Sequence, residues 1–98
     1  MEIIISQYVG LKGDARTFHR VYKEFQSNVI PHAGDFIKDS AYKEPYEYEV
    51  ASVIIDYTNN YCDVTLKIYE LETTDDSFVK REVEMFMSHG WKCDTIYM

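Results

Sequence analysis

The sequence predicts an α+β fold: a two-layer, ferredoxin-like sandwich with the order β-α-β-β-α-β, in which two helices cover one face of an antiparallel sheet. Two observations favour this fold. Apolar residues recur at helical spacing in two separate segments, and two β-rich runs flank Asn59-Asn60, a dipeptide typical of hairpin turns. The 98 residues suit a single domain, 1–98. A curled three-stranded sheet with differently packed helices is the alternative.

The N-terminal half is expected to form a strand and then a helix. The first strand covers 2–9, where Ile3-Ile4-Ile5 is too short an apolar run for a helix. From Ala15 to about Ser27, apolar residues fall at i, i+3, i+4 and i+7, which predicts an amphipathic helix with Asp14 as its N-cap. A loop and a short strand near Phe36 follow.

The middle of the chain predicts a β-hairpin formed by 46–57 and 61–71. If Asn59-Asn60 is the centre of a two-residue type I′ turn, Val53 lies opposite Leu66 and Ile55 lies opposite Val64. This register leaves an apolar outer face that no helix covers. A second copy of the chain is the expected cover, which predicts a homodimer. The expected dimer interface is Val50, Ile54 and Tyr69.

The C-terminal part predicts a second helix over 76–88 and a last strand over 91–97. Thr73-Thr74-Asp75-Asp76 supplies capping side chains, and Gly90 suits the helix end. Together the elements predict one hydrophobic core. Its expected members are Ile3, Ile5, Phe18, Val21, Phe25, Val53, Ile55, Val64, Leu66, Val83 and Phe86.

The net charge of −7 is confined to the hairpin and its flanks. Residues 35–76 hold eleven carboxylates against three lysines, and the predicted register opposes Glu49 with Glu70, Glu47 with Glu72, and Asp56 with Asp63. Like charges opposed across strands weaken a sheet, which favours a docking surface for a cationic partner. The expected partner-binding residues are Glu44, Glu47, Glu49, Asp56, Asp63, Glu70, Glu72, Asp75 and Asp76, with Tyr46 and Tyr48.

Other interpretations of these carboxylates remain open. They can keep strand edges soluble, or bind a divalent cation, although no EF-hand spacing is present. Glu49 and Glu70 could act as an acid–base pair, but no catalytic motif supports an enzyme. No zinc-ligand spacing occurs, so neither a metal nor a cofactor is expected. The acidic charge argues against direct binding of nucleic acid or of an anionic membrane.

Two cysteines and no apolar membrane span predict a reduced, cytoplasmic protein. In size, acidity and lack of catalytic motifs, the chain resembles the small acidic early proteins of phages of Gram-positive bacteria, some of which mimic DNA to disable host nucleoid proteins. This resemblance lies in overall character and assigns no residue roles. It implies an inhibitor, in the host cytoplasm, of a basic nucleoid or other DNA-binding protein. A small ferredoxin-like regulatory domain, with a ligand pocket at the helix–strand boundary, is the alternative function.

Overall fold

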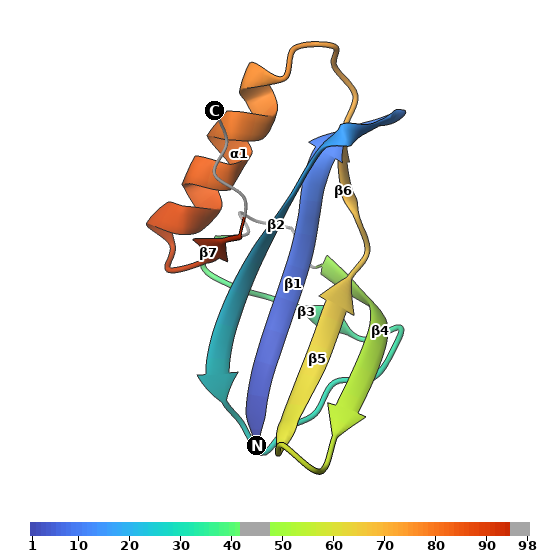
Figure 1. The fold of residues 1–98 in the computed structure, drawn as a ribbon, viewed down its shortest axis with the longest axis vertical. Helices are drawn as coiled ribbons and strands as arrows, with labels where there is room; N and C mark the ends of the chain where they lie inside the picture. The colour runs from blue at the N-terminus through green and yellow to red at the C-terminus, as the bar shows by residue number, and fades with distance from the viewer. Residues whose placement is uncertain (42–47, 95–98) are drawn as a thin grey trace.

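A computed structural model describes residues 1–41 and 48–94 as a curled mixed sheet, a half-barrel, with one helix packed beside it (Figure 1). The sheet order is β3-β4-β5-β1-β2-β7, with β6 also paired to β1. Strand β1 runs parallel to β5 and β6, and the other pairs are antiparallel. The elements are β1 (Glu2–Leu11), β2 (Asp14–Gln26), β3 (Phe36–Ile37), β4 (Tyr48–Asp56), β5 (Tyr61–Leu66), β6 (Tyr69–Leu71), α1 (Ser77–Ser88) and β7 (Lys92–Cys93).

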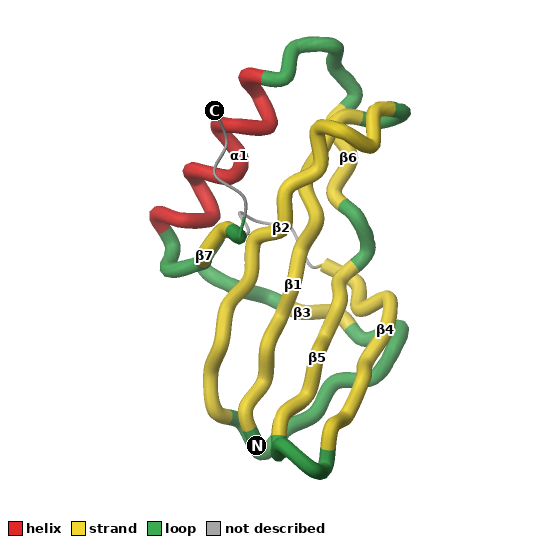
Figure 2. Tube along the Cα trace, in the orientation of Figure 1, coloured by secondary structure: helices red, strands yellow, loops and turns green. Residues whose placement is uncertain are grey.

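The expected ferredoxin-like sandwich is wrong, because the segment predicted as the first helix is the long strand β2 (Figure 2). Gly13, at φ 83°, allows a tight turn, and β2 then folds back on β1 along almost its whole length. Residues 17, 18, 21, 22 and 25 are β-branched or aromatic and suit a strand equally well. Non-local pairing with β1 therefore outweighs the local helical spacing.

The second predicted helix is present as α1. Its buried side chains are Val79, Val83 and Phe86, which lie on one side at helical spacing. The helix ends before Gly90, whose φ of 90° reverses the chain, and Trp91 then packs edge-on against Phe86 with ring centroids 5.1 Å apart. This contact fixes the helix against the short strand β7.

The predicted hairpin is also present, but its register differs by two residues. Val53 lies opposite Val64, and Ile55 lies opposite Cys62. The loop spans 57–60 instead of two residues, because the Asp56 carboxylate accepts hydrogen bonds from the main-chain N (3.0 Å) and Nδ2 (2.9 Å) of Asn59. A shift by two keeps the side chains of 52–56 and 61–65 on their expected faces.

An irregularity in β4 changes the face of one predicted interface residue. The pairing of β4 with β5 shifts between Val50 and Ser52, so the side chain of Val50 turns inward. Val50 is 1% exposed and lies in the core. The expectation that Val50 belongs to the uncovered outer face is therefore wrong.

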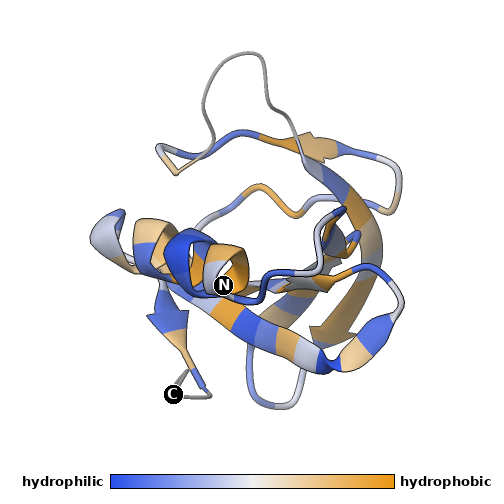
Figure 3. Ribbon diagram, turned by 90° about the horizontal axis from the view of Figure 1, so that it is seen from above, coloured by the Kyte–Doolittle hydropathy of each residue, from blue (hydrophilic) through white to orange (hydrophobic). Residues whose placement is uncertain are grey.

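The core fills the concave side of the sheet beneath α1 (Figure 3). Of the expected members, Phe25 and Ile55 are instead 41% and 38% exposed, and Phe18 and Val53 are half-buried. The other seven are buried. The buried apolar side chains are Ile3, Ile5, Val9, Leu11, Val21, Ala41, Val50, Cys62, Val64, Leu66, Val79, Val83, Phe86 and Trp91.

Candidate functional site

The Glu49–Glu70 pair expected at the open end of the hairpin does not form, and the expected Glu47–Glu72 pair includes Glu47, which lies outside the described residues. Strand β6 pairs with β1, where Glu70 lies opposite Gly10, so Glu70 has no place opposite Glu49. Glu49 lies opposite Phe36, and its Oε2 is 2.8 Å from Nζ of Lys67. A lysine therefore neutralises one of the central residues of the predicted site.

The other predicted site residues either have local partners in the fold or fall outside the described residues. Glu72 is 3.5 Å from Nζ of Lys12. Asp75 accepts a hydrogen bond from the main-chain N of Ser77 at 3.0 Å, which lowers its pKa, and Asp76 is the N-cap residue of α1. Glu44, Tyr46 and Glu47 fall outside the described residues. Tyr48, Glu49 and Glu70 still line one hollow together with Lys67, whereas the other described members of the predicted set lie elsewhere.

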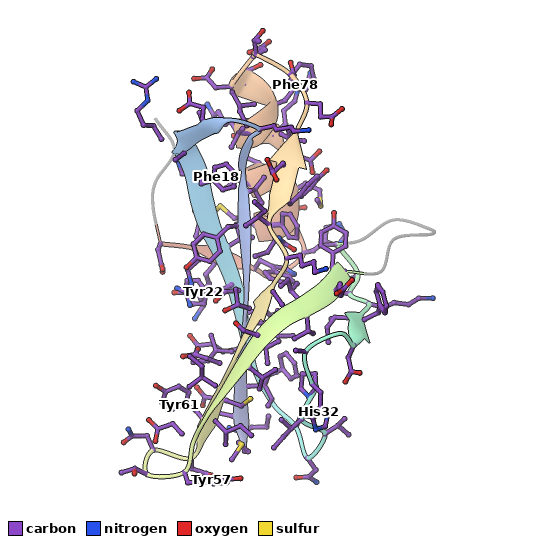
Figure 4. All side chains as sticks on the ribbon, turned by 90° about the vertical axis from the view of Figure 1, so that its right-hand side faces the viewer. Phe18, Tyr22, His32, Tyr57, Tyr61 and Phe78 are labelled. Carbon is purple, nitrogen blue, oxygen red and sulfur yellow. The ribbon has the colours of Figure 1, made fainter. Side chains whose placement is uncertain are left out.

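The outer, convex side of the sheet brings a different set of carboxylates together. Directly paired residues in neighbouring strands point to the same side of a sheet. One row across β2, β1, β5 and β4 is Glu24, Ile4, Asp63 and Ile54, and the next row is Gln26, Glu2, Tyr61 and Asp56. We call Glu2, Glu24, Asp56 and Asp63, with Ile4, Ile54 and Tyr61, the outer acidic face; Figure 4 labels Tyr61 at its lower end.

The charges of the outer acidic face are largely uncompensated. Within 1–41 and 48–94, no lysine or arginine lies within ion-pair distance of Glu2, Glu24 or Asp63. Hydrogen bonds from Asn59 lower the pKa of Asp56 and keep it ionised. Glu24 and Asp63 are separated by two strand spacings, about 10 Å. That distance is close to the screening length in physiological salt, about 8 Å, so an approaching cation interacts with several carboxylates together.

One arginine, Arg20, lies farther along the same side of the sheet. Arg20 Nε donates to Oγ of Ser6 at 2.9 Å, and its guanidinium also pairs with Asp94 and lies 4.4 Å from the ring centroid of Tyr22. Arg20 is thus held at a distance from the acidic rows. The outer side of the sheet is divided into a neutralised end and an acidic end.

Sequence reasoning identified Asp56 and Asp63 but missed Glu2 and Glu24. Both glutamates belong to the N-terminal segment, where acidic and basic residues nearly balance. Alternation along β2 would have placed Glu24 and Gln26 on one side, but only with that segment read as a strand. Because the segment was predicted as a helix, this alternation was not considered.

The three residues expected at a dimer interface do not share a surface. Val50 is in the core, whereas Ile54 is 66% exposed on the outer acidic face. Tyr69 is half-buried, and its ring packs edge-on against Tyr48 at 5.7 Å. The expected interface is therefore not one continuous patch.

A second candidate site lies on the concave side, where the chain from 27 to 39 crosses the sheet. A groove of about 280 Å³ is present there, and we call it the interior groove. Asp39 accepts hydrogen bonds from Nζ of Lys23 at 2.9 Å and from Nε1 of Trp91 at 3.0 Å. The lining is mostly apolar: Ile3, Ile5, Phe25, Val29, Pro31, Phe36, Ile37 and Trp91, with Lys23, Ser27, Lys38 and Asp39.

Three of the four polar residues that line the interior groove are charged: Lys23, Lys38 and Asp39. Burial raises the pKa of Asp39, but hydrogen bonds from Trp91, Lys23 and the main-chain N of Ala41 outweigh it and hold this pKa below its ordinary value. The Lys23 ammonium also lies 6.0 Å from the ring centroid of Trp91. An ion pair therefore stands at the wall of an otherwise apolar groove.

The described residues offer little for metal or covalent chemistry. Among them, no group of three or more His, Cys, Asp or Glu side chains is placed to hold a metal ion. Burial raises the pKa of the Cys62 thiol, which keeps it protonated and poorly nucleophilic.

Comparisons with known proteins return no relative. No protein family matches the chain, and neither a curated protein nor a solved structure resembles it. Within the described parts, no helix is both long and apolar enough to cross a membrane. The functional argument therefore rests on the two surfaces described above.

Proposed function

We propose that this protein is a non-enzymatic binding protein that captures a basic protein partner through the outer acidic face. One observation carries the proposal: four carboxylates stand on four adjacent strands, and none of them has a lysine or arginine within ion-pair distance in the described chain. Strand pairing holds them in place before a partner arrives. Such preorganised charge gives specificity and rapid association.

The chemistry of this face suits the nucleic-acid-binding surface of another protein. Such a surface carries lysines and arginines positioned for phosphates, and fixed carboxylates can take the place of those phosphates. Ile54, 66% exposed between the acidic positions, supplies an apolar contact that a partner can bury. The resemblance to phage-encoded DNA mimics supports the same partner class, a basic nucleoid or other DNA-binding protein.

Charge reversal in two variants with the same change in net charge tests the proposal. The Glu24→Lys/Asp63→Lys variant should lose capture of a DNA-binding protein, and duplex DNA should displace that protein from the unmodified chain. Glu82→Lys/Glu84→Lys, on α1, changes the net charge equally and should retain capture. Capture should also weaken as salt rises, because exposed charges are screened. Equal loss in both variants, or capture insensitive to DNA and salt, would contradict the proposal.

The interior groove supports a second candidate function, the binding of a small amphipathic molecule. Its apolar walls and its Lys23–Asp39 ion pair are the mixture that small-molecule sites use for affinity and orientation. A bound ligand would raise the melting temperature. Phe25→Ala, in the groove wall, should abolish that rise, whereas Phe78→Ala, equally exposed on α1, should preserve it. If no compound in a ligand library raises the melting temperature of the unmodified chain or of Phe78→Ala, this function is contradicted.

A further inference from the structure

Strand β4 has one open edge. On one side it pairs with β5 from Val50 to Asp56. On the other side, β3 reaches only Tyr48 and Glu49, and the preceding loop hydrogen-bonds only to Val50, through Gly34 N (2.9 Å) and Asp35 O (2.8 Å). Among the residues that the structure describes, none pairs with this side of β4 over 51–56. Figure 4 views the molecule from this side, with β4 in front.

The open edge is apolar and carries no charge before Asp56. Its sequence is Ala-Ser-Val-Ile-Ile, and Ile54 and Ile55 are 66% and 38% exposed on opposite faces of the strand. The other end of the sheet is different, because β7 covers Val21 and Tyr22 of β2 and the uncovered parts of β2 carry Arg16, Lys23 and Glu24. Charged residues at an edge prevent pairing with other chains, and an uncharged β-branched edge permits it.

We propose that a second copy of this chain pairs antiparallel with β4, about a two-fold axis at Ile54. In this register Ile54 lies opposite its own copy, Val53 lies opposite Ile55, and Asp56 lies opposite Ser52. Each apolar residue meets an apolar residue, no carboxylate opposes another, and the Ser52 hydroxyl is placed to donate to Asp56. Pairing ends before Val50, so the contacts of Gly34 and Asp35 remain intact.

The acidic charge of the chain does not prevent this pairing. Asp56 lies opposite Ser52, so its two copies are four residues apart along the paired strands, about 14 Å. Asp63 lies one strand inward on β5, so its two copies are separated by three strand spacings, about 14 Å. The screening length at physiological salt is shorter, about 8 Å. Two-fold pairing uses the β4 edge of both copies, so this assembly closes at two copies.

The dimer would place both outer acidic faces on the same side of one continuous sheet. A two-fold axis perpendicular to the sheet relates the copies, so their Ile54 side chains meet at the centre of that side. The surface available to a partner would double, which allows two-point binding. The pairing itself does not depend on the proposed function, since it rests only on the β4 edge.

Sedimentation equilibrium of the unmodified chain tests the proposal, with Ile54→Lys and Met87→Lys compared at equal charge. Met87 is also exposed, at 51%, but lies on α1. We expect a monomer–dimer equilibrium that Ile54→Lys weakens about tenfold or more and Met87→Lys leaves unchanged. Amide hydrogen exchange over 51–56 should slow as protein concentration rises.

A cross-linking experiment checks the register independently of any loss of folding. Opposed Cβ atoms in an antiparallel pair lie about 4.5–5.5 Å apart, so oxidised Ile54→Cys should form a covalent dimer. The unmodified chain and Met87→Cys are the controls and should not. A monomer at every concentration, association without protection of 51–56, assemblies larger than a dimer, or equal cross-linking of the controls would overturn the proposal.

Discussion

The side chain of Gln7 spans a break in the sheet by donating from Nε2 to the main-chain O of Lys67 at 2.6 Å. Strand β1 pairs with β5 as far as Ser6 and with β6 from Val9 onward, so Gln7 lies where the partner strand changes. Gln7 is fully buried, and its Oε1 has no hydrogen-bond partner among the described residues. A buried amide thus replaces the missing main-chain ladder at this point.

Gln7→Met should destabilise the protein by about 1–3 kcal/mol, because Lys67 O loses its donor while the volume is nearly kept. Gln7→Ala should cost more, since it also leaves a cavity. Urea unfolding measures both changes. Gln26→Met, exposed at the end of β2, is the control and should have little effect. A Gln7→Met variant as stable as the unmodified protein would show that the Lys67 bond contributes nothing.

Gly10→Ala should destabilise the protein by about 1–3 kcal/mol through overpacking. A Cβ built on Gly10 would lie 2.1 Å from Cδ1 of Phe18, so the ring covers the glycine directly. Phe18→Ala removes that obstacle, and the double variant should therefore lose less stability than the sum of the two single changes. Thermal unfolding of all four forms gives the coupling. If the stability losses of the two single variants simply add in the double variant, the Phe18 ring moves aside freely.

Asp39→Asn should lower stability at neutral pH by about 1–3 kcal/mol, because the ion pair with Lys23 is lost. The folded-state pKa of Asp39 lies below its ordinary value of 3.8. Its contribution is therefore fully present above that value and disappears as the pH falls through the lower folded-state pKa. The difference between the two proteins should shrink over that acidic range. Asp63→Asn, without a cationic neighbour in the described chain, should show no comparable loss.

Leu66→Ala should cost about 2–5 kcal/mol, as a large-to-small change in a packed core does. Leu66 is 1% exposed, whereas Ile68, two residues later, is 55% exposed. Ile68→Ala should therefore cost far less, and chemical denaturation of both variants provides the comparison. Similar losses at the two positions would contradict the face assignment of β5.

Short-range sequence signals determined α1 and the hairpin. Val79, Val83 and Phe86 share one side at helical spacing, and the sequence pattern of this segment does not equally favour a strand. The alternation of Cys62, Val64 and Leu66 identified the buried side of β5, and it survived a register error because a shift of two residues preserves each face. The confinement of the net negative charge to the middle of the chain placed Asp56 and Asp63 among the candidate residues, although not their neighbours on the sheet.

Only the tertiary structure decided the state of β2, because its apolar residues satisfy helical spacing and strand composition alike. Pairing with β1 supplies interstrand hydrogen bonds that no local pattern reports, and the strand that results brings Glu24 beside Ile4 and Asp63. The exposure of Ile54 at an open edge arises in the same way, since it depends on where β3 stops pairing with β4. Periodicity acts within a segment, whereas a surface built from four strands depends on contacts between segments distant in sequence.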